Sequence, residues 1–354
     1  MTLGSIGGYQ LVKPLGSGGM GEVFFAISPT ADPVAIKVIK QHLIEAPTVR
    51  ERFAAEVESL KLVYGSRVAR LENADAHGDP AWLAVEYVPG ATLRQHVDAH
   101  GPLSLPRAAM VGAMLADGLA RVHQVHLLHR DLKPQNIILG PDGPKVIDFG
   151  LAVLVERDDF LTAPGALVGT PAYMSPEQVR GERDLTPAVD VYGLAATLVF
   201  ALTARGLYPS TNSWNLLLRI AEPGDLPDLS GVPSELVGLL GAMLAFDPSA
   251  RPGLDDVRTR LLAVATATSG KSVLDLRQEV AELTYDPARQ EPVPPELDDP
   301  QRDPEGTTVG EENPPPGPEP DGGTPDPAPP THPRADVTWL VDKMRRQYAR
   351  RSTL

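Results

Sequence analysis

An abrupt change in composition near residue 265 separates a part of the chain that can fold from a part that cannot. Upstream of it, apolar residues recur with the periods of strands and helices. Downstream, residues 291–333 read EPVPPELDDPQRDPEGTTVGEENPPPGPEPDGGTPDPAPPTHP, with too few apolar side chains to offset the entropy of ordering and with many prolines. The sequence therefore predicts one folded domain over residues 9–264 and an acidic, proline-rich disordered linker over residues 265–334.

Helical spacing returns at two places beyond this domain. The segment SVLDLRQEVAEL (272–283) predicts a short helix within the linker. The segment DVTWLVDKMRRQYARRSTL (336–354) has one apolar face among basic residues, which predicts a basic amphipathic helix over residues 335–354. Its apolar positions are Val337, Leu340, Val341, Met344 and Tyr348. Such a helix can contact an anionic membrane, a partner's groove or the acidic domain itself, and a solvated tail is the alternative.

Charge and composition exclude several classes of protein. The formal net charge of -14 argues against nucleic-acid binding, which needs Lys and Arg to neutralise phosphates. The absence of cysteine excludes disulfides and thiolate metal sites and suits a reducing cytoplasm. The longest apolar stretch, VYGLAATLVFALTA (191–204), is shorter than the roughly 20 residues that cross a bilayer. We therefore expect a buried helix there, no transmembrane segment and a cytoplasmic location.

The order of strand-like and helical patterns predicts an α+β fold with two lobes. Four strand-like runs lie in the first 88 residues, and one helical pattern, TVRERFAAEVESLKLV (48–63), interrupts them. The runs are YQLVKPL, GEVFFAI, PVAIKVI and AWLAVEYV. From residue 92 onward most long periodic segments are helical. The expected architecture is a small β-rich lobe over residues 9–88 joined to a larger α-helical lobe over residues 89–264.

The glycine-rich segment GSGGMGEV places Gly16, Gly18 and Gly21 between two of the strand-like runs. Glycine lets a backbone approach an anion and point its N–H groups at phosphate oxygens. The pattern alone is weak evidence, because it also occurs in flexible hairpins and at dinucleotide-binding helices. The following run EVFFAI is typical of a strand and not of a helix, which favours a hairpin that covers a nucleotide.

Lys37 lies in the strand-like run VAIK among apolar neighbours, where a lysine needs either a solvent exit or an anionic partner. The candidate partners are Glu56 and Glu58 in the helix that follows. Glu56 is preferred because it lies nearer the apolar face of that helix, three residues after Phe53.

The segment HRDLKPQN gathers Asp131, Lys133 and Asn136 on one short turn, and Asp148 follows at the end of the apolar run KVID. A carboxylate and an amide oxygen suit Mg²⁺, which is held in proteins by few side chains together with substrate phosphates. Asp131 could receive a hydroxyl group, and Lys133 could neutralise a phosphate. The set predicts a phosphoryl-transfer site.

The motifs GSGGMG, VAIK, HRDLKPQN, DFG and SPE occur in the order and spacing of eukaryotic-like (Hanks-type) serine/threonine protein kinases. Over roughly residues 9–264 the chain resembles actinobacterial members of that family. The resemblance implies a bilobal protein-kinase fold and Mg-ATP as cofactor, with Mn²⁺ able to substitute. It also implies transfer of the γ-phosphoryl group to Ser or Thr hydroxyls of protein substrates.

By this resemblance, a glycine loop, an apolar pocket, a Lys–Glu pair and a hinge form the ATP site. The residues concerned are Gly16, Ser17, Gly18, Gly19, Met20, Gly21, Val23, Ala35, Lys37, Glu56, Val85, Glu86 and Val88. Lys37 is expected to contact the α and β phosphates while paired with Glu56. Val85 takes the gatekeeper position, and the backbone of residues 86–88 resembles the hinge that binds adenine.

The same resemblance assigns the catalytic and metal-binding roles. Asp131 is expected to orient the substrate hydroxyl and accept its proton, and Lys133 to steady the γ-phosphate. Asn136 and Asp148 are expected to hold Mg²⁺. The presence of Lys133 at its position is typical of serine/threonine and not of tyrosine kinases.

Three further residues are expected to support the geometry of the helical lobe. Glu177 of GTPAYMSPE is expected to pair with Arg251, and Asp190 to brace the catalytic loop. His129 is expected to be a packed, hydrogen-bonded core histidine and not a base, and His123 a packing or surface residue.

Regulation by phosphorylation is indicated by Arg130, which could bind a phosphate on the activation segment. Thr162 is the only hydroxyl residue between DFG and GTP and is the first candidate for autophosphorylation, with Thr170 second. Dimerisation would allow this reaction in trans. A mobile loop that needs no phosphate is the alternative.

Two other functions fit parts of the pattern. A pseudokinase or scaffold would bind nucleotide or a partner without transfer, but Lys37, Asp131, Asn136 and Asp148 are all present. A small-molecule phosphotransferase of similar fold is disfavoured by HRDLKPQN together with GTPAYMSPE, which indicate a peptide substrate.

Overall fold

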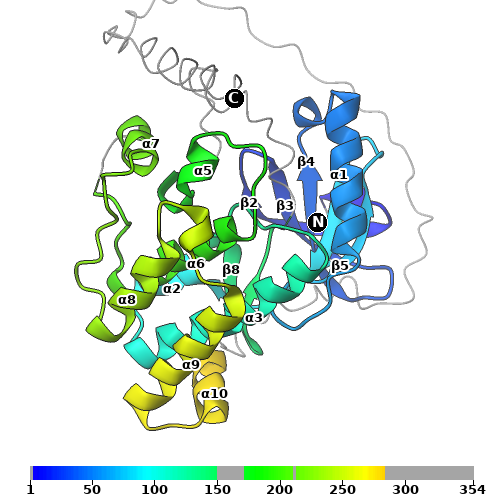
Figure 1. Cartoon of the computed structure of the whole chain (residues 1–354). Coiled ribbons are helices and arrows are strands. Elements are labelled where there is room, and N and C mark those ends of the chain that lie inside the picture. Colours follow the sequence, from blue (N-terminus) through cyan, green and yellow to red (C-terminus); the bar gives the residue numbers. More distant parts are fainter. Residues whose placement is uncertain (1–2, 150–170, 210–212, 284–354) are drawn as a thin grey trace, which may run out of the picture. The chain divides into compact units, whose positions relative to one another are not determined.

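Six strands form one antiparallel sheet in the N-terminal lobe, in the order β1-β2-β3-β4-β6-β5 (Figure 1). The structure is a computed structural model that describes residues 3–149, 171–209 and 213–283. The strands are β1 (Gly4–Ile6), β2 (Tyr9–Ser17), β3 (Gly21–Ile27), β4 (Pro33–Ile39), β5 (Leu71–Asp75) and β6 (Trp82–Glu86). The four predicted runs correspond to β2, β3, β4 and β6. The sequence did not indicate β1 and β5, which are short and mostly exposed.

The register of the sheet places the predicted pocket residues on one face. Lys37 of β4 lies opposite Val23 of β3 and Leu83 of β6, and Ala35 lies opposite Val85. Because side chains alternate between the two faces of a strand, these five residues point to the same side. The residues between them, among them Ile36 and Ala84, are buried in a cluster on the other face with Tyr9, Leu11 and Trp82.

Helix α1 (Pro47–Leu60) packs beside this sheet, close to the range predicted for it (Figure 1). Its buried residues Val49, Phe53 and Val57 recur at helical spacing and meet Ile39 and Leu83 of the sheet. Glu56 is therefore carried on a helix whose apolar face fixes its rotation.

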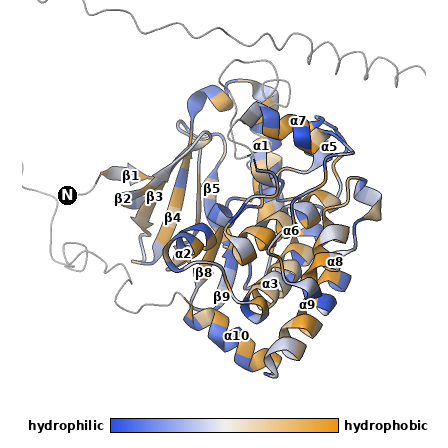
Figure 2. Ribbon diagram, turned by 90° about the vertical axis from the view of Figure 1, so that its left-hand side faces the viewer, coloured by the Kyte–Doolittle hydropathy of each residue, from blue (hydrophilic) through white to orange (hydrophobic). Residues whose placement is uncertain are grey.

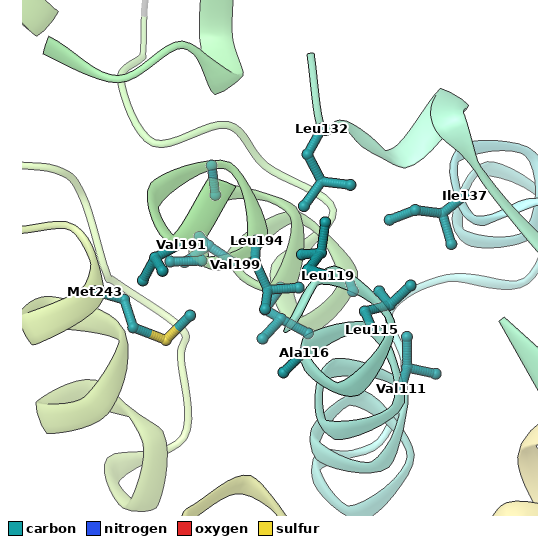
Figure 3. Packing of buried hydrophobic residues seen from close by; sticks show 14 of the residues in the cluster. Val111, Leu115, Ala116, Leu119, Leu132, Ile137, Val191, Leu194, Val199 and Met243 are labelled. Atoms are coloured by element: carbon teal, nitrogen blue, oxygen red, sulfur yellow. The ribbon is translucent and has the colours of Figure 1, made fainter. Parts of the chain in front are cut away.

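The C-terminal lobe is helical, and its core lies between α3 (Leu105–Gln124) and α6 (Ala188–Thr203). Every residue of α6 from Val189 to Leu202 is buried, as predicted for the apolar stretch 191–204. Figure 3 shows side chains of α3 and α6 packed against one another, with Leu132 and Ile137 of the HRDLKPQN region beside them. The polar residues of that region are thus flanked in the chain by side chains that are buried in this core.

Other elements complete the lobe. A small sheet joins β7 (Ala91–Thr92), β8 (Ile137–Gly140) and β9 (Gly143–Val146). The remaining α-helices are α2 (Leu93–His100), α5 (Pro176–Val179), α7 (Ser213–Ala221), α8 (Ser234–Met243), α9 (Leu254–Ser269) and α10 (Val273–Glu282). Short 3-10 turns are η1 (Gln41–Leu43), η2 (Pro134–Asn136), η4 (Pro171–Tyr173) and η5 (Pro248–Ala250).

The folded part extends beyond the boundary expected at residue 264. Helix α9 continues to Ser269, and α10 follows after a left-handed Gly270. A capping box between Ser272 and Asp275 begins α10, which matches the helix predicted over 272–283. Leu276 and Val280 are buried against the C-terminal lobe, and apolar residues alternate with polar ones along the helix in Figure 2. Residues 265–283 are thus structured, in contrast to the predicted linker, because these two side chains find an apolar surface on the lobe.

Within the described ranges, no helix is both long and apolar enough to cross a membrane. The predicted basic helix over 335–354 and the acidic stretch from residue 284 onward lie outside those ranges.

Truncating Leu276 tests whether α10 is part of the folded unit. Leu276 is 1% exposed, so we expect Leu276→Ala to lower the free energy of unfolding by about 2–5 kcal/mol. Leu274 lies on the same helix but is 71% exposed, so Leu274→Ala should change it by no more than about 0.5 kcal/mol. Urea unfolding of the full chain measures both, and equal effects of the two variants would show that α10 does not pack as described.

Candidate active site

A cavity of about 710 Å³ is lined by both lobes and contains most of the predicted site residues. Its apolar walls include Val23, Ala35, Leu83 and Val85 of the sheet and Ile147 after β9. Its polar lining includes Lys37, Asp148 and Asp131 and Lys133 of the HRDLKPQN segment. A cavity of this size with an apolar wall and few polar groups is typical of a site for a nucleotide-sized molecule.

The glycine loop forms the hairpin between β2 and β3, as the sequence predicted. The amide of Gly18 donates to the carbonyl of Gly21 at 2.9 Å. A side chain at Gly21 would meet the Val38 carbonyl oxygen at 2.0 Å, so the sheet itself requires glycine there. A side chain at Gly16 or Gly18 would meet nothing within 4 Å. The space beside these two glycines is therefore open to a ligand that approaches the backbone.

Lys37 forms an ion pair with Asp148, with 3.0 Å between Nζ and Oδ2. The lysine is 8% exposed, so its charge needs this carboxylate. The sequence predicted Glu56 as its partner, and in this structure that pairing is not formed. Instead Lys37, which was predicted to bind phosphates, forms its ion pair with Asp148, which was predicted to bind the metal.

Glu56 pairs with Arg130, with 3.0 Å between Oε1 and the Nη1 that donates to it. Oε2 of Glu56 and Nε of Arg130 are buried and have no hydrogen-bond partner among the described residues. Burial raises the pKa of Glu56 to about 7, although the charge and hydrogen bond of Arg130 act in the opposite direction. The carboxylate is thus incompletely satisfied where it lies, because only one of its oxygens is bonded.

The segment from Asp131 to Asn136 is tied together by its own polar groups. Lys133 Nζ donates to Asp131 Oδ2 at 2.7 Å, and Asn136 Nδ2 donates to the Asp131 carbonyl at 2.8 Å and to its Oδ2 at 3.1 Å. Because the amide nitrogen of Asn136 is used in this way, its oxygen is the atom available to a cation. Asp131, Lys133 and Asn136 therefore lie together as the sequence predicted.

The side-chain oxygens of Asn136 and Asp148 fit a Mg²⁺ ion whose other ligands are the phosphates of a substrate and water. Asn136 and Asp148 lie on adjacent segments, since the amide of Ile147 donates to the Asn136 carbonyl at 2.9 Å. In the described ranges no group of three or more His, Cys, Asp or Glu side chains could hold a metal by itself. Mg²⁺ commonly takes one or two protein oxygens together with phosphates and water, so two protein donors suffice.

Asp190 of α6 supports the backbone of the segment HRDLKPQN (129–136), which we call the catalytic segment. Its two oxygens accept from the amides of His129 at 2.9 Å and Arg130 at 2.8 Å. Burial acts to raise the pKa of this carboxyl, but the hydrogen bond and charge of His123 and the groups of His129 outweigh it and hold the pKa below its usual value. Arg130 adopts a left-handed φ of 64°, a strained backbone that these contacts hold in place.

His123 was missed by sequence reasoning, which treated it as packing or surface. Its Nε2 lies 2.7 Å from Asp190 Oδ2, so it is the third donor to this buried carboxylate. His129, in contrast, is the packed histidine that was predicted. It is fully buried, its Nε2 lies 3.0 Å from the Ile147 carbonyl, and its Nδ1 accepts from the Asp131 amide at 3.2 Å.

Glu177 and Arg251 form a buried, two-bond ion pair, at 2.6 and 2.8 Å, as predicted. The next residue, Gln178, was missed. Its Nε2 donates to the carbonyl of Arg130 at 2.6 Å, and its Oε1 accepts from the Ser175 amide. The segment from Ser175 to Gln178 is thus hydrogen-bonded directly to the catalytic segment.

The hinge also has a partner that sequence reasoning missed. Glu86 forms an ion pair with Lys145 of β9, and its amide donates to the Arg70 carbonyl at 2.8 Å. Val85 and Val88 line the cavity beside it. Thr162 and Thr170, the predicted phosphorylation sites, lie outside the described residues.

The pKa of Glu56 gives a test of its pairing. Because the folded pKa of about 7 exceeds the ordinary 4.5, the folded protein binds more protons than the unfolded chain between these values. The free energy of unfolding therefore falls as pH rises through this window, by at most about 3 kcal/mol. Glu56→Gln should remove this fall, while the exposed Glu58→Gln should keep it, in urea unfolding between pH 5 and 8. Parallel pH profiles for wild type and Glu56→Gln would contradict the raised pKa.

Comparison with known proteins agrees with this geometry. The protein kinase domain model matches residues 9–261. The chain is 42% identical over 258 residues to the probable serine/threonine-protein kinase PkwA of Thermomonospora curvata, and 38% identical over 256 residues to the serine/threonine-protein kinase AfsK of Streptomyces coelicolor. The first alignment covers 73% of this chain and 34% of the relative, the second 72% and 32%, so the chain spans about a third of the length of these relatives.

Solved structures show the same fold. The Mycobacterium tuberculosis PknI kinase domain superimposes with a TM-score of 0.61 at 23% identity, covering 75% of this chain and 99% of that one. The family match over more than two thirds of the chain, together with relatives that are named serine/threonine-protein kinases, shows that this chain belongs to the protein kinase family.

Proposed function

We propose that this chain transfers the γ-phosphoryl group of Mg-ATP to Ser or Thr hydroxyls of proteins. The observation that carries the proposal is that Lys37, Asp131, Lys133 and Asp148 line one cavity together with the glycine loop. Mg²⁺, with Asn136 and Asp148 as its protein ligands, would neutralise charge on the transferred phosphate. Mn²⁺ would be accepted by the same oxygen ligands.

Each side chain would have a separate task. Lys37 would bind the α and β phosphates, and the carbonyl of Glu86 and the amide of Val88 would bind adenine. Asp131 would hold the acceptor hydroxyl and take its proton, and its present partner Lys133 would turn to the γ-phosphate. Both lysines are already beside the carboxylates that would meet the reacting groups. Binding of ATP therefore needs only an exchange of partners.

We further propose that the pairing of Glu56 with Arg130 belongs to a resting arrangement. In the catalytic arrangement Glu56 would pair with Lys37, which frees Asp148 for the metal. A phosphate on Thr162, or failing that Thr170, would bind Arg130 as a doubly charged anion and compete with Glu56 for it. Reaction in trans would need a dimer, and this, like a cytoplasmic location, stays a prediction.

Transfer of radiolabel from ATP tests the principal proposal. We expect Asp131→Asn and Lys37→Met each to lower phosphorylation of a protein substrate at least about a hundredfold, because each removes a group that acts in the transition state. Lys61→Met is the control, since Lys61 is exposed and its ion-pair partner among the described residues is Glu58, which lies on the same helix. Full transfer by the Asp131→Asn variant would overturn the assignment and favour a binding scaffold.

Mapping of phosphate after incubation with Mg-ATP tests the regulation. We expect Thr162 to be modified, and the doubly substituted Thr162→Ala, Thr170→Ala chain to be at least about tenfold less active, because Arg130 would stay with Glu56. Mass spectrometry and a substrate assay measure these two results. An active kinase in which neither threonine carries phosphate would contradict the switch.

A further inference from the structure

The backbone of the glycine loop has little side-chain packing to fix its conformation. The loop contains Gly16, Gly18, Gly19 and Gly21, and glycine gives a backbone more conformational freedom than any other residue. A Cβ atom at Gly16 or Gly18 would have no neighbour within 4 Å, so nothing packs against the loop at these two positions. A loop that its ligand has to order binds that ligand more weakly. Contacts that order the loop before a ligand enters therefore strengthen binding.

The end of strand β4 supplies two such contacts at Met20. The side chain of Met20 is partly buried and packs against the apolar cluster that contains Ile39 and Ile44. The backbone amide of Lys40, the residue that follows β4, donates to the Met20 carbonyl at 3.1 Å. This bond continues the pairing of Gly21 with Ile39 in the sheet. The sheet thus holds one side of the loop.

The side chain of Lys40 adds a third contact, to Gly18. Its Nζ donates to the Gly18 carbonyl at 2.8 Å. A hydrogen bond from a charged donor is stronger than one between two neutral groups. The amide of Gly18 donates to the Gly21 carbonyl at 2.9 Å, so both polar groups of Gly18 are engaged. Lys40 itself is exposed, and its substitution therefore leaves the apolar core of the lobe intact.

The bond from Lys40 to Gly18 determines where the next amide points. Within the described ranges the cis peptide is Asp79–Pro80, so the peptide between Gly18 and Gly19 is trans. The C=O and N–H of a planar trans peptide point in opposite directions. Gly18 and Gly19 belong to the lining of the cavity and Lys40 does not. Because the Gly18 carbonyl is turned to Lys40, the N–H of Gly19 is turned toward the cavity.

We propose that Lys40 is a positioning residue for ATP, which holds the Gly18 carbonyl so that the Gly19 amide donates to a phosphate oxygen. The inference rests on the proposed kinase function, which supplies ATP as the ligand. Lys40 does not touch the nucleotide in this arrangement. A backbone N–H that is already oriented needs no reorganisation when the anion binds, and this makes it an effective donor.

Calorimetric titration of the full chain tests the inference with two probes. They are adenosine and the Mg²⁺ complex of the imido analogue of ATP, whose γ-phosphoryl group is not transferred. We expect Lys40→Met to weaken binding of the analogue about fivefold or more, as for loss of one hydrogen bond, and to change adenosine binding by less than about twofold. Lys40→Arg keeps a charged donor and should bind both probes nearly as the wild type does. Lys61→Met, at an exposed lysine of the same lobe outside the cavity, is the control.

Two substitutions of Gly19 separate this role from a direct bond between the Lys40 ammonium and phosphate. Gly19→Pro removes the amide hydrogen, whereas Gly19→Ala keeps it. In the Gly19→Ala background, Lys40→Met should weaken binding of the analogue as it does in the wild type. In the Gly19→Pro background its further effect should be less than about twofold, because the group that Lys40 positions is absent.

Three results would overturn the inference. Lys40→Met could weaken both probes equally, which would show a general effect on the cavity, or it could weaken neither. It could also act equally in the two Gly19 backgrounds, which would show that the ammonium binds phosphate directly. Transfer of radiolabel is measured separately. A wild-type chain that shows the expected binding but transfers no phosphate would overturn the proposed function and leave the role of Lys40 in nucleotide binding standing.

Discussion

The geometry of the active site depends on one buried carboxylate, Asp190. A carboxylate removed from water is costly unless hydrogen bonds satisfy it, and here two backbone amides and His123 do so. Those amides belong to His129 and Arg130, the residues that precede Asp131. Helix α6, which is buried from Val189 to Leu202, thereby sets the position of the catalytic segment. Removing any one of the three donors would leave the carboxylate incompletely hydrogen-bonded. The free energy gained by satisfying this charge therefore offsets the strain of the backbone at Arg130.

Arg130 connects this support to helix α1 of the N-terminal lobe. Its backbone is held by Asp190 and Gln178, whereas its side chain is paired with Glu56 of α1 in the other lobe. In the proposed switch, Arg130 would exchange Glu56 for a phosphate, and Lys37 would exchange Asp148 for Glu56. Each exchange would replace one ion pair by another. A phosphate that binds Arg130 better than Glu56 does would shift the balance between the two arrangements.

The sequence predicted those features that local chemistry decides. The glycine hairpin, the turn from Asp131 to Asn136 and the Glu177–Arg251 pair follow from residue types at short spacing or from a family pattern. It could not predict which partner Glu56 takes, because the choice between the cations Arg130 and Lys37 depends on how α1 is positioned. His123 was missed because a histidine near a helix end gives no sign of a carboxylate 67 residues later in the chain. The helix over 272–283 was predicted, but residues 265–283 were assigned to the linker and not to the folded domain, because a short helix is stabilised by the surface it covers.

Helix α10 shows how such a surface contributes to the site. It packs on α3 and on β9, and β9 carries the Lys145 that pairs with Glu86 of the hinge. The loop after α1 reaches the same strand, since Val68 bridges to Val146 and Arg67 donates to the Asp142 carbonyl. The hinge, this loop and α10 therefore share one support, the β8–β9 hairpin. Because buried apolar contacts stabilise the elements that they join, a helix beyond the expected domain boundary helps to fix the edge of the cavity that Glu86 and Val88 line.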